Sequence, residues 1–228
     1  MKKVLIVGAG GYAKEILWVL DDLNRCRLEF ECVGFVDPQD PGKKGKVLSG
    51  RPILGGWADI SPTPELHFAC GIGAPDAREK ECSAAQQLGL KPISLIHPSA
   101  VIATDAEIGE GSVLAPTSVV APTSRLGRHC ALNVGAIVGH DAVLGDYCVL
   151  SPGAIVLGNA RLEEKVFLGA NSTVYLGRRM GKGALLAANS FLMTNLGSGK
   201  SALGTPATQF SIKTGAGICT NQEKKGRD

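Results

Sequence analysis

The sequence is poor in aromatic residues, which make up 5% of the chain, and it contains no apolar run long enough to span a membrane. The apolar stretch Val4–Val7 is cut by Gly8, so it is also too short for the core of a signal peptide. Blocks of like charge are scarce, because 24 Lys and Arg are interspersed with 21 Asp and Glu, and the formal net charge is only +3. We therefore expect a cytoplasmic protein that binds neither membrane nor nucleic acid.

Cysteine patterns typical of disulfide frameworks or zinc sites are also absent. The chain has seven cysteines, an odd number, and none of them forms a Cys-x-x-Cys pair. This pattern argues against a disulfide framework and against a structural zinc site. The sequence therefore predicts reduced thiols and no metal.

Glycine is abundant, with 30 residues, and an aliphatic residue recurs at every sixth position through the second half of the chain. The repeat keeps its phase over sixteen hexads: Ile102, Ile108, Leu114, Val120, Leu126, Leu132, Val138, Leu144, Leu150, Val156, Leu162, Leu168, Val174, Met180, Leu186 and Leu192. Four residues after each of these stands a small residue in most hexads, the clearest exceptions being Arg178 and Leu196. Neither a helix nor an ordinary strand sustains a period of six.

A triangular prism explains both the recurring aliphatic residues and the recurring small residues. Each hexad supplies one short strand and one turn, and three hexads complete a coil, so the aliphatic residue fills the interior and the small residue fits inside a corner. Sixteen hexads give roughly five coils, about 25 Å of stacked strands. Cys130 and Cys148 lie one coil apart at the same corner, and we expect them to be reduced corner residues although they could approach disulfide distance.

The first hundred residues alternate between strand and helix patterns. Strands are predicted at Val4–Val7, Val33–Val36, His67–Ile72 and Ile93–Leu95, with a helix after Gly11 and another from Ala77 to Leu88. This order predicts a small Rossmann-like α/β domain with a parallel sheet. We divide the chain into this α/β domain (residues 1–97), the hexapeptide-repeat domain (98–210) and a polar C-terminal tail (211–228).

The turn after the first strand is rich in glycine. Gly8, Gly10 and Gly11 would allow bare backbone N–H groups to face an anion at the start of a helix. Asp37, at the end of the second strand, could accept hydrogen bonds from a ribose or a base. A tight turn without a ligand is the alternative, and binding of intact NAD is disfavoured because the domain holds only half of the usual doubly wound sheet.

Four segments together resemble the PglD/NeuD-like sugar acyltransferases: GAGGYAKE, FVD, IHPSA at the start of the hexads, and GHD within them. The resemblance spans roughly residues 1–210. It implies a left-handed β-helix, a homotrimer with acetyl-CoA between neighbouring prisms, and a nucleotide-linked sugar held by the first domain. Carried over by position, the substrate-binding candidates are Gly8, Gly10, Gly11, Tyr12 and Asp37.

His140 is the candidate catalytic residue. Acetyl transfer to an amine needs a base for the amine proton, and His140 should leave the prism at a corner, two residues after the inward Val138. Asp141 follows and could orient the imidazole. The resemblance assigns His140 as general base with Asp141 in support, places Asn133 in the site, and lays the backbones of Gly158 and Ala188 along acetyl-CoA. The other histidine of the repeat, His129, is expected on the solvated surface.

This chain differs from the family pattern at several positions. Pro38 stands where many members have a second acid, and Val149 where members often have histidine. Gly204-Thr205-Pro206-Ala207 resembles the family's G-V-P-A turn, but Thr208 and Gln209 replace the basic pair that usually follows.

The resemblance implies N-acetylation of the 4-amino group of a UDP-, dTDP- or GDP-linked sugar, within polysaccharide or glycan biosynthesis. One alternative is O-acetylation of sialic acid or a related sugar, and another is a non-catalytic nucleotide-binding scaffold. A β-helix carbonic anhydrase would need three convergent histidines, whereas the repeat has two. The sequence leaves the sugar and the nucleotide open.

Overall fold

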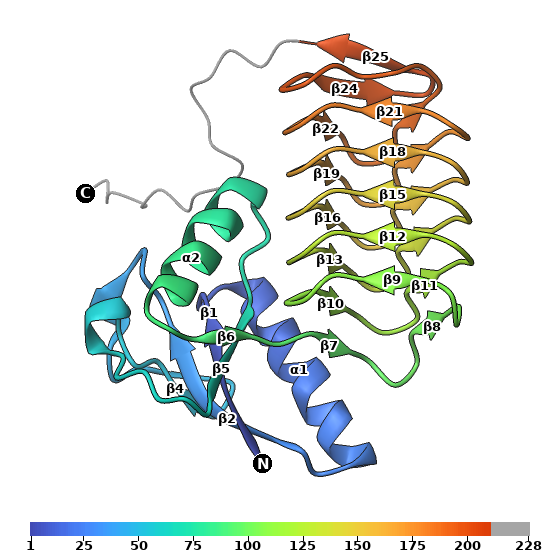
Figure 1. Cartoon of the computed structure of the whole chain (residues 1–228). Helices are drawn as coiled ribbons and strands as arrows, with labels where there is room; N and C mark the ends of the chain where they lie inside the picture. The colour runs from blue at the N-terminus through green and yellow to red at the C-terminus, as the bar shows by residue number, and fades with distance from the viewer. Residues whose placement is uncertain (211–228) are drawn as a thin grey trace, which may run out of the picture.

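The computed structural model describes residues 1–210, in which a small α/β part adjoins a tall column of short strands (Figure 1). The predicted tail, residues 211–228, lies outside the described residues. The fold is the predicted one, a Rossmann-like parallel sheet followed by a left-handed parallel β-helix. No helix within residues 1–210 is both long and apolar enough to cross a membrane.

The N-terminal sheet has four parallel strands in the order β2-β1-β5-β6. Their bounds are β1 Lys2–Val7, β2 Phe30–Val36, β5 Leu66–Cys70 and β6 Lys91–Pro92, and the helices are α1 Gly11–Cys26 and α2 Pro75–Gln87. Between β2 and β5 lie the short hairpin of β3 Val47–Leu48 with β4 Arg51–Pro52 and two 3-10 turns, Pro41–Lys43 and Trp57–Asp59. The predicted strand at Ile93–Leu95 is wrong, because the chain leaves the sheet there and enters the column.

The column has three faces, which we call face 1, face 2 and face 3 in chain order. Face 1 contains β7 Leu95–Ile96, β10 Val113–Leu114, β13 Ala131–Leu132, β16 Val149–Leu150, β19 Phe167–Leu168, β22 Leu185–Leu186, β24 Ser201–Gly204 and β25 Ala207–Phe210. Face 2 contains β8 Val101–Ile102, β11 Val119–Val120, β14 Ile137–Val138, β17 Ile155–Val156, β20 Thr173–Val174 and β23 Phe191–Leu192. Face 3 contains β9 Glu107–Ile108, β12 Arg125–Leu126, β15 Val143–Leu144, β18 Arg161–Leu162 and β21 Arg179–Met180.

From β7 to β20, each strand of the repeat pairs in parallel with the strand 18 residues later, so one coil stacks directly on the next. All sixteen aliphatic residues of the hexads are the second residue of such a strand and point into the prism. The small residues that stand four positions after the aliphatic ones fill the corners of the prism. Cys130 and Cys148 are among them as buried free thiols. A hairpin of β24 and β25 closes the top, and its turn is the predicted GTPA segment.

The N-terminal part docks on the column through both helices (Figure 1). Helix α1 packs at the base, where its apolar side joins Leu95 and Val113 of face 1 in one core cluster. Helix α2 runs beside the edge between faces 3 and 1, hereafter edge 3–1. Leu95 already pairs with Val113 of the first coil, so strand pairing within the column begins three residues before residue 98.

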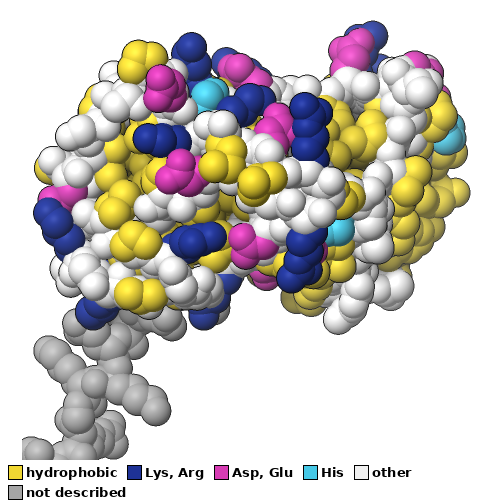
Figure 2. All heavy atoms as spheres, turned by 90° about the horizontal axis from the view of Figure 1, so that it is seen from below, with side chains coloured by type: hydrophobic (Ala, Val, Ile, Leu, Met, Phe, Trp, Pro, Cys, Tyr) yellow, Lys and Arg dark blue, Asp and Glu magenta, His cyan; other side chains and the backbone are white. Residues whose placement is uncertain are grey.

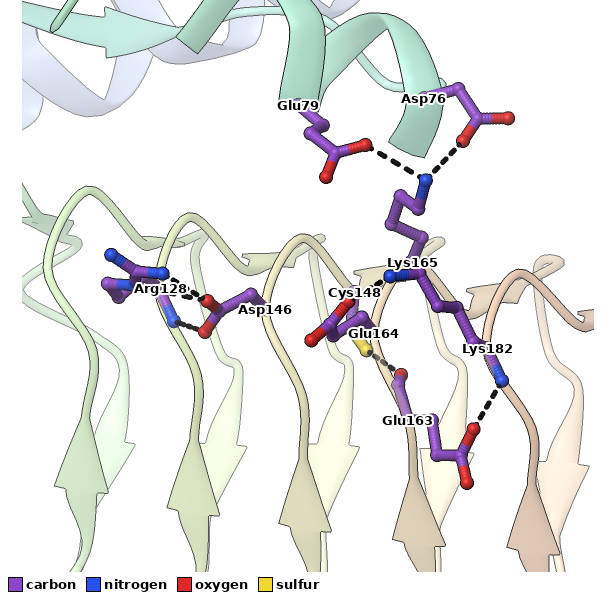
Figure 3. Close-up of polar contacts among 9 residues, drawn as sticks. All are labelled: Asp76, Glu79, Arg128, Asp146, Cys148, Glu163, Glu164, Lys165 and Lys182. Atoms are coloured by element: carbon purple, nitrogen blue, oxygen red, sulfur yellow. Dashed lines mark hydrogen bonds and ion pairs between the residues drawn. The ribbon is translucent and has the colours of Figure 1, made fainter. Parts of the chain in front are cut away.

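Charged residues of edge 3–1 form ion pairs with helix α2 and with one another. Lys165 bonds Glu79 Oε2 at 2.9 Å and Asp76 Oδ1 at 3.1 Å, and the two carboxylates raise the pKa of Lys165 (Figure 3). Along the same edge Arg128 pairs with Asp146 one coil above, at 2.8 Å. The helix and the edge are thus held by complementary charge where both meet solvent.

Beneath these ion pairs, Arg78 of α2 is completely buried. Its Nε donates to the carbonyl of His129 at 2.6 Å, and one terminal nitrogen donates to the carbonyls of Cys70 and Ile72 at 2.9 and 3.0 Å. One guanidinium therefore joins the end of β5 to the column.

His129 is buried, with 1% of its surface exposed, so the expectation of a solvated residue is wrong. Its ring stacks between Phe68 of β5 and Tyr147 of the next coil, with centroid distances of 5.9 and 5.2 Å. Burial lowers the pKa of His129 to about 4, and the Arg78 cation adds to this shift. Nothing in the sequence indicates that a helix covers this corner.

Candidate functional site

The glycine-rich turn lies at the carboxyl end of β1, where the first turn of α1 is open. Gly8 has φ +99° and its N–H donates to Val36 O at 2.7 Å, while a Cβ on Gly10 or Gly11 would meet nothing within 4 Å. No side chain caps this 16-residue helix. Its exposed N–H groups and the positive end of the helix dipole favour an anion such as a diphosphate.

The polar groups of the Asp37 and Tyr12 side chains are less available to a ligand at this turn than their positions in the sequence indicate. Asp37 is 7% exposed, and its Oδ2 accepts a hydrogen bond from Lys43 at 2.6 Å, which raises the pKa of that lysine. The hydroxyl of Tyr12 is buried beside Arg78, and burial raises its pKa to about 12. Because Tyr12 as a whole is only half-buried, a ligand could contact its backbone N–H or the exposed part of its ring, but not its hydroxyl.

His140 and Asp141 lie together on the edge between faces 2 and 3, hereafter edge 2–3. His140 lies two residues after the end of β14, and its Nδ1 lies 2.8 Å from Asp141 Oδ2. Because a carboxylate only accepts hydrogen bonds, Nδ1 carries the proton and Nε2 is left as the basic nitrogen. The side chain of His140 is 58% exposed, so a substrate can approach the imidazole.

The backbone of Gly158, one coil above, makes room for this ring. A Cβ on Gly158 would stand 2.5 Å from His140 Nε2 and 2.6 Å from Cε1. Gly158 is itself buried under the imidazole. Its role in the structure is thus to let the imidazole lie along the edge, which adds to the cofactor contact proposed from sequence.

Asn133 and Ala188 occupy a different edge, the one between faces 1 and 2, hereafter edge 1–2. Asn133 follows β13 and is 8% exposed, and its Oδ1 has no hydrogen-bond partner within residues 1–210. Ala188 follows β22, three coils higher, and is exposed. Within one chain, the predicted site residues of the column therefore lie on two edges with face 2 between them, apart from those of the glycine-rich turn.

Face 3 differs from faces 1 and 2 in the outward residues of its strands. On face 1, the first residues of the two-residue strands are all apolar: Leu95, Val113, Ala131, Val149, Phe167 and Leu185. On face 2 these are apolar with one threonine: Val101, Val119, Ile137, Ile155, Thr173 and Phe191. On face 3 they are mostly charged: Glu107, Arg125, Val143, Arg161 and Arg179. Seen from below, both signs of charge are mixed with apolar side chains (Figure 2), in keeping with the small net charge.

Within residues 1–210, no group of three or more His, Cys, Asp or Glu side chains is arranged to hold a metal ion. Val149, where family members often have histidine, is 2% exposed on face 1 and away from His140.

The N-terminal part matches a known family. Residues 3–84 match the family model described as the PglD N-terminal domain. UDP-N-acetylbacillosamine N-acetyltransferase of Bacillus subtilis (strain 168) is 31% identical over 118 residues, which are 50% of this chain and 51% of that protein. The match thus spans about half the length of this curated relative.

Solved structures resemble the whole described fold. Perosamine N-acetyltransferase from Caulobacter crescentus, solved as a histidine-to-asparagine variant with CoA and GDP-perosamine, superposes with a TM-score of 0.82 at 28% identity, over 92% of this chain and 97% of that chain. The acetyltransferase domain of PglB from Neisseria gonorrhoeae FA1090, solved with acetyl coenzyme A, gives 0.81 at 28% identity, over 92% and 99%. These matches confirm the resemblance to the PglD-like sugar acyltransferases.

Proposed function

We propose that this chain, a PglD-like sugar acyltransferase in sequence and fold, transfers the acetyl group of acetyl-CoA to the 4-amino group of a nucleotide-linked sugar. The observation that carries the proposal is the His140–Asp141 pair, whose free Nε2 lies at the exposed edge 2–3. The relatives support the same chemistry, since the Caulobacter enzyme was solved with CoA and GDP-perosamine.

In the proposed reaction, His140 Nε2 accepts a proton from the amine as the amine nitrogen attacks the thioester carbonyl. The C–S bond then breaks, and the proton passes from His140 to the departing thiolate. Asp141 stabilises the imidazolium formed in between, because its carboxylate already accepts from Nδ1. The chain's own part is proton transfer and orientation.

We propose that the nucleotide part of the acceptor binds at the turn of Gly8, Gly10 and Gly11, with Asp37 and the backbone of Tyr12 beside it. The open first turn of α1 suits a diphosphate. These contacts do not select one nucleotide over another. One oxygen of Asp37 already accepts a hydrogen bond from Lys43, which leaves the other oxygen for a ligand.

We propose a homotrimer as the working unit. Within one chain, the N-terminal part docks at edge 3–1 and at the base of face 1, whereas His140 lies on edge 2–3. A second copy that packs against the apolar face 2 would bring its edge 1–2, with Asn133 and Ala188, alongside His140 and Gly158 of the first. Such a head-to-tail contact closes into a ring when three copies complete the rotation.

The activity is tested by thiol release from acetyl-CoA with UDP-, dTDP- and GDP-linked 4-amino sugars offered in parallel with free sialic acid. The proposal predicts turnover with at least one of the nucleotide-linked amines and none with sialic acid. Turnover with sialic acid alone would instead identify an O-acetyltransferase. Calorimetry that finds no acetyl-CoA binding would favour a scaffold without catalysis.

A further inference from the structure

Edge 2–3 carries a third polar residue next to the His140–Asp141 pair. Thr123 precedes Asp141 by 18 residues and so lies one coil below it, and its Oγ1 is 2.6 Å from Asp141 Oδ1. The other carboxylate oxygen, Oδ2, accepts from His140 Nδ1 at 2.8 Å. Both oxygens of one carboxylate are therefore held, one from below and one from its own corner.

We propose that Thr123 is a positioning residue for acetyl transfer, which acts through Asp141 to fix the orientation and the tautomer of His140. This inference rests on the proposed role of His140 as the base. Thr123 is not a catalytic residue in this account, because its hydroxyl contacts the carboxylate and not the imidazole.

The geometry shows why a second contact matters. The Asp141 side chain is 51% exposed and stands on left-handed backbone with φ 58°. An exposed carboxylate held by one hydrogen bond can rotate about its side-chain torsions and lose its partner to water. A contact at each oxygen leaves a single arrangement, in which Nδ1 stays protonated and Nε2 stays free.

The hydroxyl of Thr123 has one proton and two acceptors at 2.6 Å, the carbonyl of Pro122 and Oδ1 of Asp141. A hydrogen bond to an ionised acceptor is stronger than one to a neutral carbonyl, so the carboxylate is the favoured partner. In agreement, the Thr123 hydroxyl is the largest cause that lowers the pKa of Asp141, ahead of His140.

The chain contains its own control for this residue. The tetrapeptide Ala-Pro-Thr-Ser occurs twice, at residues 115–118 and 121–124, on successive edges of the column. Thr117 has φ 57° against 58° for Thr123, and its hydroxyl bonds the preceding Pro116 carbonyl at 2.7 Å. One coil above Thr117, however, stands Gly135 in place of an aspartate. The two threonines thus share local structure and differ in the carboxylate.

The first test compares Thr123→Val with Thr117→Val in the full chain. For Thr123→Val we expect kcat to fall about tenfold, because misoriented groups lose proximity, with the KM values for acetyl-CoA and acceptor unchanged. Thr117→Val should keep wild-type kcat, and Thr123→Ser, which retains the hydroxyl, should restore it. Equal kcat for the two valine variants would overturn the inference.

A double-mutant cycle with Asp141→Asn tests whether Thr123 acts through the carboxylate. We expect Thr123→Val to add no further loss in the Asp141→Asn background, since its partner is already removed. A full additional loss in that background would show a merely structural role. If Thr123→Val fails to fold, Thr123→Ser with wild-type kcat and Thr123→Ala with reduced kcat would carry the same comparison.

Failure of this inference is distinguishable from failure of the proposed function. A fully active His140→Ala removes the base and the Thr123 inference together. An inactive His140→Ala beside indistinguishable Thr123→Val and Thr117→Val removes this inference alone.

Discussion

The imidazole of His140 lies against the backbone of Gly158, so closely that a methyl group there would stand 2.5 Å from Nε2. Both residues belong to edge 2–3 and are separated by one coil of 18 residues. The basic nitrogen is therefore positioned from three sides: by the glycine above it, by Asp141 at Nδ1, and by Thr123 below the carboxylate.

Gly158→Ala should displace the imidazole and lower kcat by about tenfold or more, because reacting groups must meet within a fraction of an ångström. Gly158 does not have a left-handed φ, so the alanine itself causes no backbone strain. Steady-state kinetics measures the effect. Gly197→Ala is the control, since its Cβ would meet only a side-chain carbon of Lys200 at 3.7 Å. Unchanged kcat in Gly158→Ala would show that the ring position is irrelevant.

Arg78→Met should destabilise the protein by about 3–5 kcal/mol, because it leaves two buried carbonyl groups and a partly buried one without their donor. Lys165→Met, on the outer side of the same joint, should cost at most about 1 kcal/mol, as ion pairs near solvent contribute little. Urea unfolding compares the two variants. Similar losses in both would contradict the view that the buried guanidinium is the main connection between α2 and the column.

The buried His129 should make stability depend on pH. Its pKa of about 4 in the folded state lies below that of an unfolded histidine, about 6.5. Between these values the unfolded chain binds more protons, so the free energy of unfolding falls as pH decreases, by at most about 1.4 kcal/mol per pH unit from this residue. His129→Phe should flatten this slope while it keeps a ring between Phe68 and Tyr147. Parallel pH profiles for wild type and variant would contradict the assignment.

Val119→Lys should dissociate the proposed trimer, because Val119 lies on the apolar face 2 and a buried lysine would lack a partner. Val143→Lys is the matched control, a valine in the equivalent strand position on the charged face 3, and should leave assembly unchanged. Sedimentation velocity distinguishes the two. Dissociation by Val143→Lys alone would place the contact between subunits on face 3 and contradict the proposed trimer.

The column could be predicted to the residue, because a six-residue period with an inward aliphatic position is compatible with only one arrangement of strands and turns. All sixteen predicted inward residues occupy that place. The start of the first helix and both ends of the second, Ala77 to Leu88 against the observed Pro75–Gln87, were also predicted within two residues, since glycine and proline mark these limits. The strand at Ile93–Leu95 was misplaced because a short apolar run carries no information about which of two adjoining sheets it joins.

Contacts between the two parts could not be predicted. Nothing near Arg78 or His129 in the sequence indicates that α2 lies against edge 3–1, so a buried cation and a stacked imidazole look like surface residues. Tyr12 was likewise predicted to bind the substrate, whereas its hydroxyl is buried. Thr123, by contrast, was within reach of sequence reasoning, because residues 18 apart must stack and 123 is one such step below 141.

The most direct measurement is the kcat of His140→Ala for acetyl transfer to a nucleotide-linked 4-amino sugar, with acetyl-CoA binding checked by calorimetry and His67→Ala, a histidine of β5, as control. The account predicts a fall of about 10²- to 10⁴-fold in kcat with acetyl-CoA still bound, which is the usual contribution of a general base. His67→Ala should match wild type. Near-normal turnover in His140→Ala would contradict the account.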